Sequence, residues 1–84
     1  MKVLPVRLPF GEHEKFELKL YNYDGDHLIW DHKGRSQGEG ELFMLDPQPY
    51  VKYGVRKFRL LIAGRRKVDT VYFRVDQAGN VIKE

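Results

Sequence analysis

Apolar and polar side chains alternate with a period of two along most of this chain. Residues 4–10 (LPVRLPF) place Leu4, Val6 and Leu8 on one side, and residues 16–20 (FELKL) repeat the pattern. Because successive side chains of a strand point to opposite faces of a sheet, this alternation is typical of strands with one buried face. No stretch has the i, i+3, i+4, i+7 spacing of an amphipathic helix of about ten residues. The chain is therefore predicted to be all-β.

Turn residues divide the alternating segments into about six or seven short strands. The strands are expected within residues 3–10, 16–21, 27–31, 55–63, 68–75 and 81–82, and the apolar run 42–45 has no clear face. Residues 46–49 (DPQP) are expected to form a turn that stops any helix. Pro5 and Pro9 predict an edge position for the first strand, because proline cannot donate to a central ladder. This pattern favours a small antiparallel β-sandwich, with a small β-barrel as the alternative.

Two features are similar to fibronectin type III and immunoglobulin-like domains. Trp30 lies in the third expected strand, and the turn Leu45-Asp46-Pro47 precedes a tyrosine-bearing segment. The resemblance implies a sandwich of two sheets, and it carries no function because this architecture hosts many unrelated ones. A chain of 84 residues is expected to form a single β domain over residues 1–84.

Composition excludes several classes of site. The chain contains no cysteine, so disulfide bonds, a cysteine-based zinc site and thiol catalysis are all excluded. Fifteen Lys and Arg against twelve Asp and Glu give a net charge of +3, which permits an acidic partner without requiring one. Pro5, Arg7 and Pro9 interrupt the apolar residues near the start, and no run approaches the roughly 20 apolar residues of a membrane span. We expect a cytoplasmic chain without membrane contact, either a complete small product or an excised domain.

The segment 21–34 (YNYDGDHLIWDHKG) concentrates acids and imidazoles. It contains Asp24, Asp26, His27, Asp31 and His32. Because the buried faces of the second and third strands both use even positions, the numbers of opposed residues must sum to an even number. A loop of residues 23–25 meets this condition, pairs Leu20 with Leu28, and places Gly25 where a left-handed residue closes the loop. The segment is therefore predicted to be a turn with solvated flanks.

The same geometry argues against a metal site in this segment. His27 and Asp31 are expected on one face of the strand, and His32 on the other, beside Phe16. A calcium loop needs glycine at its sixth position and glutamate at its twelfth, and a loop starting at Asn22 has neither. A zinc site needs about three convergent ligands. No metal and no other cofactor is expected.

The sequence contains no recognisable catalytic motif. Ser36 is the only serine, and no GxSxG pattern surrounds it. A triad of Ser36, His32 and Asp31 fails, because the two partners occupy adjacent positions that face opposite ways. The glycines in residues 34–40 lack the Lys-Ser/Thr pair of a phosphate loop. We expect the protein not to be an enzyme.

The segment 55–75 is predicted to form a hairpin with a basic outer face. A four-residue loop, 64–67, preserves the alternation on both strands and pairs Ala63 with Val68. The cations and the tyrosine outside and at the tip form a candidate anion or nucleic-acid site, which consists of Lys57, Arg59, Arg65, Arg66, Lys67, Tyr72 and Arg74. Cations neutralise phosphates and tyrosine can stack a base. Alternating cations equally keep a half-buried strand soluble.

Exposed tyrosines indicate a second candidate site. Tyr21 and Tyr23 form a candidate protein interface, because tyrosine combines apolar area with a polar tip. The edge strand at 3–10 and the short last strand offer main-chain groups for strand addition. We therefore expect a non-catalytic interaction or structural module that binds another protein or associates with itself. The alternative is nucleic-acid binding through the 55–75 hairpin.

Overall fold

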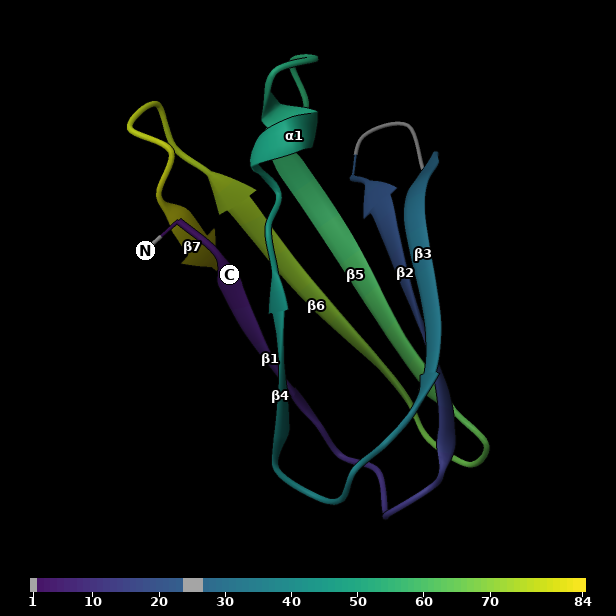
Figure 1. The fold of residues 1–84 in the computed structure, drawn as a ribbon. Helices are drawn as coiled ribbons and strands as arrows, with labels where there is room; N and C mark the ends of the chain where they lie inside the picture. Colours follow the sequence, from purple (N-terminus) through teal and green to yellow (C-terminus); the bar gives the residue numbers. More distant parts are fainter. Residues whose placement is uncertain (1, 24–26) are drawn as a thin grey trace.

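Two antiparallel sheets face each other in the computed structural model, which describes residues 2–23 and 27–84 (Figure 1). The strands of this described part are β1 (Leu4–Leu8), β2 (Lys15–Asn22), β3 (Leu28–Arg35), β4 (Glu41–Leu45), β5 (Lys57–Gly64), β6 (Val68–Val75) and β7 (Val81–Lys83), and its helix is α1 (Gln48–Val51). Five strands form one sheet in the order β3-β2-β5-β6-β7, and β1 pairs with β4 in a two-stranded sheet. The predicted all-β sandwich is confirmed.

The strands are divided five and two between the sheets, and neither sheet closes into a barrel. A constant-type immunoglobulin domain divides its strands four and three. The likeness to that class therefore extends to the sandwich architecture and not to the distribution of strands. The outer face of the larger sheet is left uncovered by the smaller one (Figure 1).

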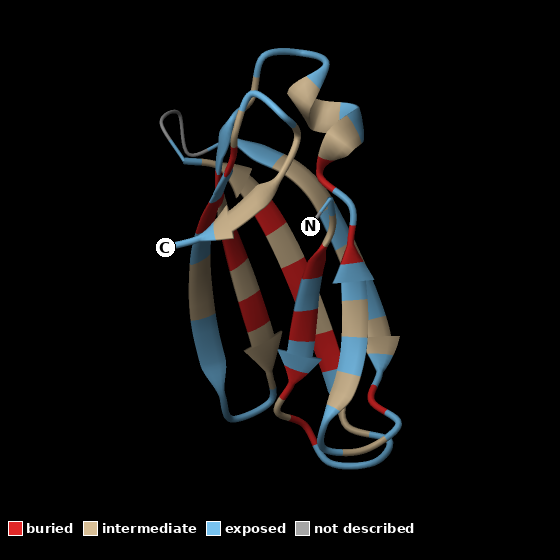
Figure 2. Ribbon diagram, turned by 90° about the vertical axis from the view of Figure 1, so that its left-hand side faces the viewer, coloured by how far each residue is buried: buried red, intermediate tan, exposed pale blue. Residues whose placement is uncertain are grey.

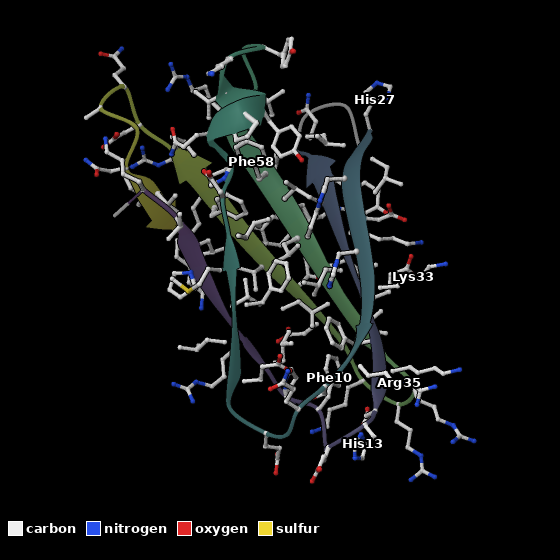
Figure 3. The ribbon with its side chains drawn as sticks, in the orientation of Figure 1. Phe10, His13, His27, Lys33, Arg35 and Phe58 are labelled. Atoms are coloured by element: carbon white, nitrogen blue, oxygen red, sulfur yellow. The ribbon has the colours of Figure 1, made fainter. Side chains whose placement is uncertain are left out.

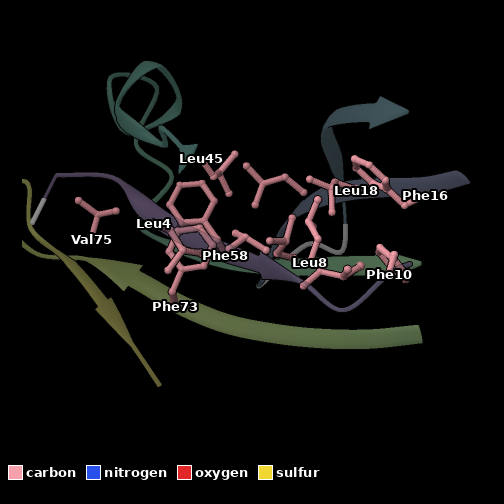
Figure 4. Close-up of a cluster of buried hydrophobic side chains, with 13 residues drawn as sticks. Leu4, Leu8, Phe10, Phe16, Leu18, Leu45, Phe58, Phe73 and Val75 are labelled. Atoms are coloured by element: carbon pink, nitrogen blue, oxygen red, sulfur yellow. The ribbon is translucent and has the colours of Figure 1, made fainter. Parts of the chain in front are cut away.

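The core is formed by the predicted apolar sides of β1, β2, β5 and β6, together with Leu45 of β4 and Phe10 (Figures 2 and 4). The buried apolar residues on the strands are Leu4, Val6, Leu8, Phe16, Leu18, Leu20, Leu45, Phe58, Leu60, Ile62, Phe73 and Val75. Phe58 lies directly opposite Phe73, and their stacked rings are 4.9 Å apart between centroids. Each such buried side chain stabilises the fold by about 1.5–3 kcal/mol relative to an exposed one. The sandwich is therefore held together by packing between its two inner faces.

Phe10 closes the end of this core beyond β1. Its side chain is fully buried and stacks on Phe16 with ring centroids 5.8 Å apart. The ring lies over Gly64, where an added Cβ would overlap its edge. Ser36, which is also buried, donates from its hydroxyl to the Phe10 carbonyl at 3.1 Å. Gly64 is thus required by the close approach of an aromatic ring.

The predicted pairing of β2 with β3 is wrong by two residues. Leu20 lies opposite Trp30, and Tyr21 lies opposite Leu28, so Ile29 is an extra residue in a bulge. Because a bulge inserts one residue into one strand, the side chains beyond it exchange faces. Leu28, expected in the core, is accordingly 51% exposed. Residues 24 and 25 of the predicted loop 23–25 lie outside the described part of the chain.

Two further segments differ from expectation. Residues 46–49 are predicted to exclude a helix, yet α1 begins at Gln48 and forms a single turn. Pro47 at the N-cap and Pro49 just inside are compatible with it, because the first N–H groups of a helix have no intrahelical acceptor. Strand β4 has a defined face, since it pairs with β1 and buries its last residue, Leu45.

No helix among the described residues is long and apolar enough to cross a membrane.

The turn between β6 and β7 is organised by the Asp76 carboxylate. This group accepts hydrogen bonds from the backbone N–H of Asn80 at 2.8 Å and of Ala78 at 2.9 Å. The bond from Asn80 is the largest cause, and together with the bond from Ala78 it holds the pKa of Asp76 below its ordinary value of 3.8. The ionised form is therefore the one that stabilises the turn.

Gly64→Ala should destabilise the protein by about 1–3 kcal/mol, because the new methyl group meets a buried ring that has no room to move. Gly11→Ala is the matched control, because the nearest atom to its added Cβ is at an ordinary 3.7 Å. Urea denaturation of both variants measures the difference. Equal stability of the two variants would show that Phe10 does not pack as described.

Asp76→Ala should lower the melting temperature at neutral pH. Since the folded pKa is depressed, the stabilisation is present above the ordinary value of 3.8 and is lost as the pH falls through the lower folded pKa. The melting temperature of the Asp76→Ala variant should therefore approach that of the unaltered protein as the pH is lowered. Asp31→Ala, on β3, is the control. If the melting temperature of the variant stays equally far below that of the unaltered protein at the lowest pH, the assigned role of the carboxylate is contradicted.

Candidate functional surface

The tyrosines and several of the hairpin cations lie together on the outer face of the larger sheet. In the register of β2, β5 and β6, Tyr21 lies opposite Arg59, which lies opposite Tyr72. The next row outward is formed by Tyr23, whose N–H donates to the Lys57 carbonyl at 3.0 Å, and by Lys57 opposite Arg74. We call this surface the tyrosine face; it consists of Tyr21, Tyr23, Lys57, Arg59, Tyr72 and Arg74. The candidate protein interface and the strand residues of the candidate anion site therefore form one surface.

Contacts between side chains orient the tyrosine face. The Arg59 guanidinium carbon lies 4.4 Å from the centre of the Tyr21 ring. The rings of Tyr23 and Tyr72 meet edge to face at 5.3 Å. A cation over a ring stabilises by about 0.5–1 kcal/mol at an exposed site, and an aromatic pair by about 0.5–1.5 kcal/mol. Tyr23 and Tyr72 nevertheless stay 48% and 40% exposed, so the surface is ordered and accessible at once.

Positive charge on this face is not cancelled by the two aspartates of strand β6 and its following turn. Lys57 and Arg74 are directly opposed, and like charges in that position repel. The Asp76 carboxylate is held by the turn that follows β6. Asp69 lies opposite Ile62, whose side chain is buried in the sandwich. The Asp69 side chain therefore points to the inner side of the sheet, away from the tyrosine face. An acidic partner would relieve the repulsion.

The predicted anion site is divided between two ends of the sheet. The hairpin register is as predicted, with Ala63 opposite Val68 and the Gly64 N–H donating to the Lys67 carbonyl at 2.7 Å. The exposed tip residues Arg65, Arg66 and Lys67 follow the far end of β5. Lys57 begins the eight-residue strand, so about 25 Å of chain separates it from the tip. The tip therefore does not share a binding pocket with the tyrosines.

The acids and imidazoles of residues 21–34 do not converge. The Asn22 N–H donates to the His27 carbonyl, and Asp31 lies opposite Lys19. His27 lies before β3, which begins at Leu28, so the expectation that it shares a face with Asp31 stays a prediction. Asp24 and Asp26 lie outside the described residues. Within the described ranges 2–23 and 27–84, no group of three His, Asp or Glu side chains could hold a metal ion.

His32 is a packing residue, as predicted. Its ring lies 6.1 Å from Phe16 and is stacked at 6.0 Å on Trp30. It also lies 5.1 Å from Phe43 of the smaller sheet. Ser36 is likewise structural, since its hydroxyl bonds the Phe10 carbonyl and accepts the Gly38 N–H at 3.1 Å.

Sequence reasoning missed a group of cations at the tip end of the larger sheet. Lys15 lies directly opposite Arg35, and Lys33 lies two residues along on β3 (Figure 3). These side chains border an open hollow of about 690 Å³, together with Arg65. The alternation places them on an outer face, but only the correct β2–β3 register brings Lys15 to Arg35.

Comparison with known proteins adds no relative. No protein-family model, no curated protein and no solved structure matches the chain. The function is therefore inferred from the surfaces themselves.

Proposed function

We propose that this chain is a non-catalytic module that binds another protein through the tyrosine face. The observation that supports this is the pair of ordered contacts, Arg59 on Tyr21 and Tyr23 on Tyr72, on a sheet face that the rest of the fold leaves open. Tyrosine and arginine are the residue types that dominate binding energy at protein interfaces. Side chains that are already oriented lose less rotamer freedom on binding.

The charge of the surface indicates the chemistry of the partner. Lys57, Arg59 and Arg74 give the tyrosine face a positive character, which suits an acidic protein surface and speeds association with it. A symmetric dimer through this face would bring the face against itself, since a two-fold interface uses the same patch on both chains. That arrangement opposes cations to cations. A different, acidic protein is therefore the better partner.

Strand addition offers a second route to a protein partner. The free edge of β1 contains Pro5, which has no N–H to offer to an added strand. Strand β7 is three residues long. Both edges are weaker docking sites than the tyrosine face.

Nucleic-acid binding is the second candidate function. Cations occur along the β5–β6 hairpin from Lys57 and Arg74 to the tip at 65–67, as a phosphate backbone would require. However, Arg59 already covers one side of the Tyr21 ring, and Tyr23 and Tyr72 pack on each other. Fewer ring faces remain for stacking on bases, so the protein-binding function is favoured.

Replacing Tyr23 and Tyr72 together by alanine should reduce retention of the partner at least about tenfold, because interface hot spots contribute about 2 kcal/mol or more. The measurement compares nuclease-treated cell extract passed over the immobilised protein and over this variant. The matched control removes two equally exposed side chains from the smaller sheet, Leu42→Ala with Met44→Ala. Retention of the same proteins by both variants would exclude the tyrosine face.

The nucleic-acid alternative predicts a different result. Retention should then be abolished by nuclease, and binding of a labelled single strand should fall steeply with salt. Replacing Arg65, Arg66 and Lys67 by glutamine should reduce the salt slope by about one unit for each phosphate that is no longer neutralised. Salt-insensitive retention after nuclease treatment contradicts this alternative and supports the protein partner.

A further inference from the structure

The hollow at the tip end of the larger sheet has a small-residue floor and a basic rim. Its volume is about 690 Å³, and Ala63 and Gly64 line it. Both positions are small on the strand that runs between β2 and β6. Ala63 lies opposite Glu17 on the outer face, whereas a side chain on Gly64 would point to the core, where Phe10 lies. Figure 3 shows Lys33 and Arg35 extending outward from β3 at this end of the molecule. The depression is therefore floored by Ala63 and the Gly64 main chain and bordered by cations.

The cations of the rim are not balanced by the acids beside them. Glu17 lies opposite Lys33 and is 4.0 Å from the Lys19 ammonium group, so its single negative charge lies between two cations. Glu14, the other acid at the hollow, accepts the Gly11 N–H at 3.2 Å and keeps its negative charge. The two carboxylates therefore face four cations, Lys15, Lys33, Arg35 and Arg65, and a net positive charge remains. Lys15 and Arg35, by contrast, are directly opposed across the β2–β3 ladder, and such like-charge pairs are destabilising.

An anion between Lys15 and Arg35 would convert this repulsion into attraction. Arg65 approaches the same hollow from the hairpin tip, so three strands or loops contribute positive charge to one place. Arginine binds phosphate oxygens through two parallel hydrogen bonds, and lysine adds a compact positive charge. A phosphate group is the anion that best uses this combination.

We propose that this basic hollow binds a phosphorylated small molecule of about nucleotide size. The phosphate lies between Lys15 and Arg35, and the organic part lies over Ala63. The volume of the hollow falls in the range of about 300–1,000 Å³ that is typical of small-molecule sites. The Lys15–Arg35 pair lies six residues along β2 from Tyr21, about 20 Å away, and the nearest lining residue on β2, Glu17, is about 13 Å away, so the hollow is separate from the tyrosine face.

The test is a titration of the whole chain with adenosine 5′-monophosphate, followed by the amide resonances in NMR spectra. Resonances of Lys15, Arg35 and Gly64 should shift and saturate, while those of Tyr21 and Tyr72 stay in place. Adenosine at the same concentration should cause no saturating shift. Equal shifts with adenosine, or shifts centred on the tyrosine face, would overturn the proposal.

A pair of matched variants separates a local site from general electrostatics. Lys15→Gln with Arg35→Gln should weaken binding of adenosine 5′-monophosphate at least about tenfold, since the charge-assisted hydrogen bonds to the phosphate are removed. Lys57→Gln with Arg74→Gln removes the same charge from another directly opposed pair on the same face, and should change the affinity less than about twofold. An equal decrease of affinity in both variants would overturn the site. The Lys15→Gln, Arg35→Gln variant leaves every residue of the tyrosine face unchanged, so partner retention by this variant is scored separately.

Discussion

The structure depends on the packing of β1 and β4 against one face of the five-stranded sheet. The chain has no cysteine, and burial of apolar side chains is what holds the two layers together. The alternation sends the large apolar residues of β2, β5 and β6 to that inner face, where Phe58 stacks on Phe73. This arrangement leaves the outer face free of any role in the core.

The same register that packs the core assembles the outer surface. Because side chains alternate, the pairing that sets Phe58 against Phe73 also sets Arg59 beside Tyr72 on the other side. Tyr21 joins them from β2, and its ring lies beneath the Arg59 guanidinium. An exposed face needs only polar residues for solubility, so a cluster of ordered tyrosines there is an additional feature that a binding function accounts for.

The β5–β6 hairpin could be predicted pair by pair, because both strands alternate clearly and one loop length satisfies both inner faces. The β2–β3 hairpin could not, since the bulge at Ile29 adds a residue that alternation alone does not reveal, and this residue moves Leu28 out of the core. The distribution of strands between two sheets depends on contacts between distant segments. The basic hollow escapes prediction for the same reason, because Lys15 meets Arg35 only in the correct register.

The central claim is that the inner face folds the protein and that the tyrosines of the outer face are available for binding. Urea denaturation of two variants tests it most directly. Phe58→Ala should lower the free energy of unfolding by about 3–5 kcal/mol, as is usual for a buried phenylalanine. A triple variant with Tyr21, Tyr23 and Tyr72 changed to threonine should unfold cooperatively and be destabilised by at most about 2.5 kcal/mol, the sum of its surface interactions. A triple variant destabilised as much as Phe58→Ala would show that the tyrosines serve the fold, and would contradict the account.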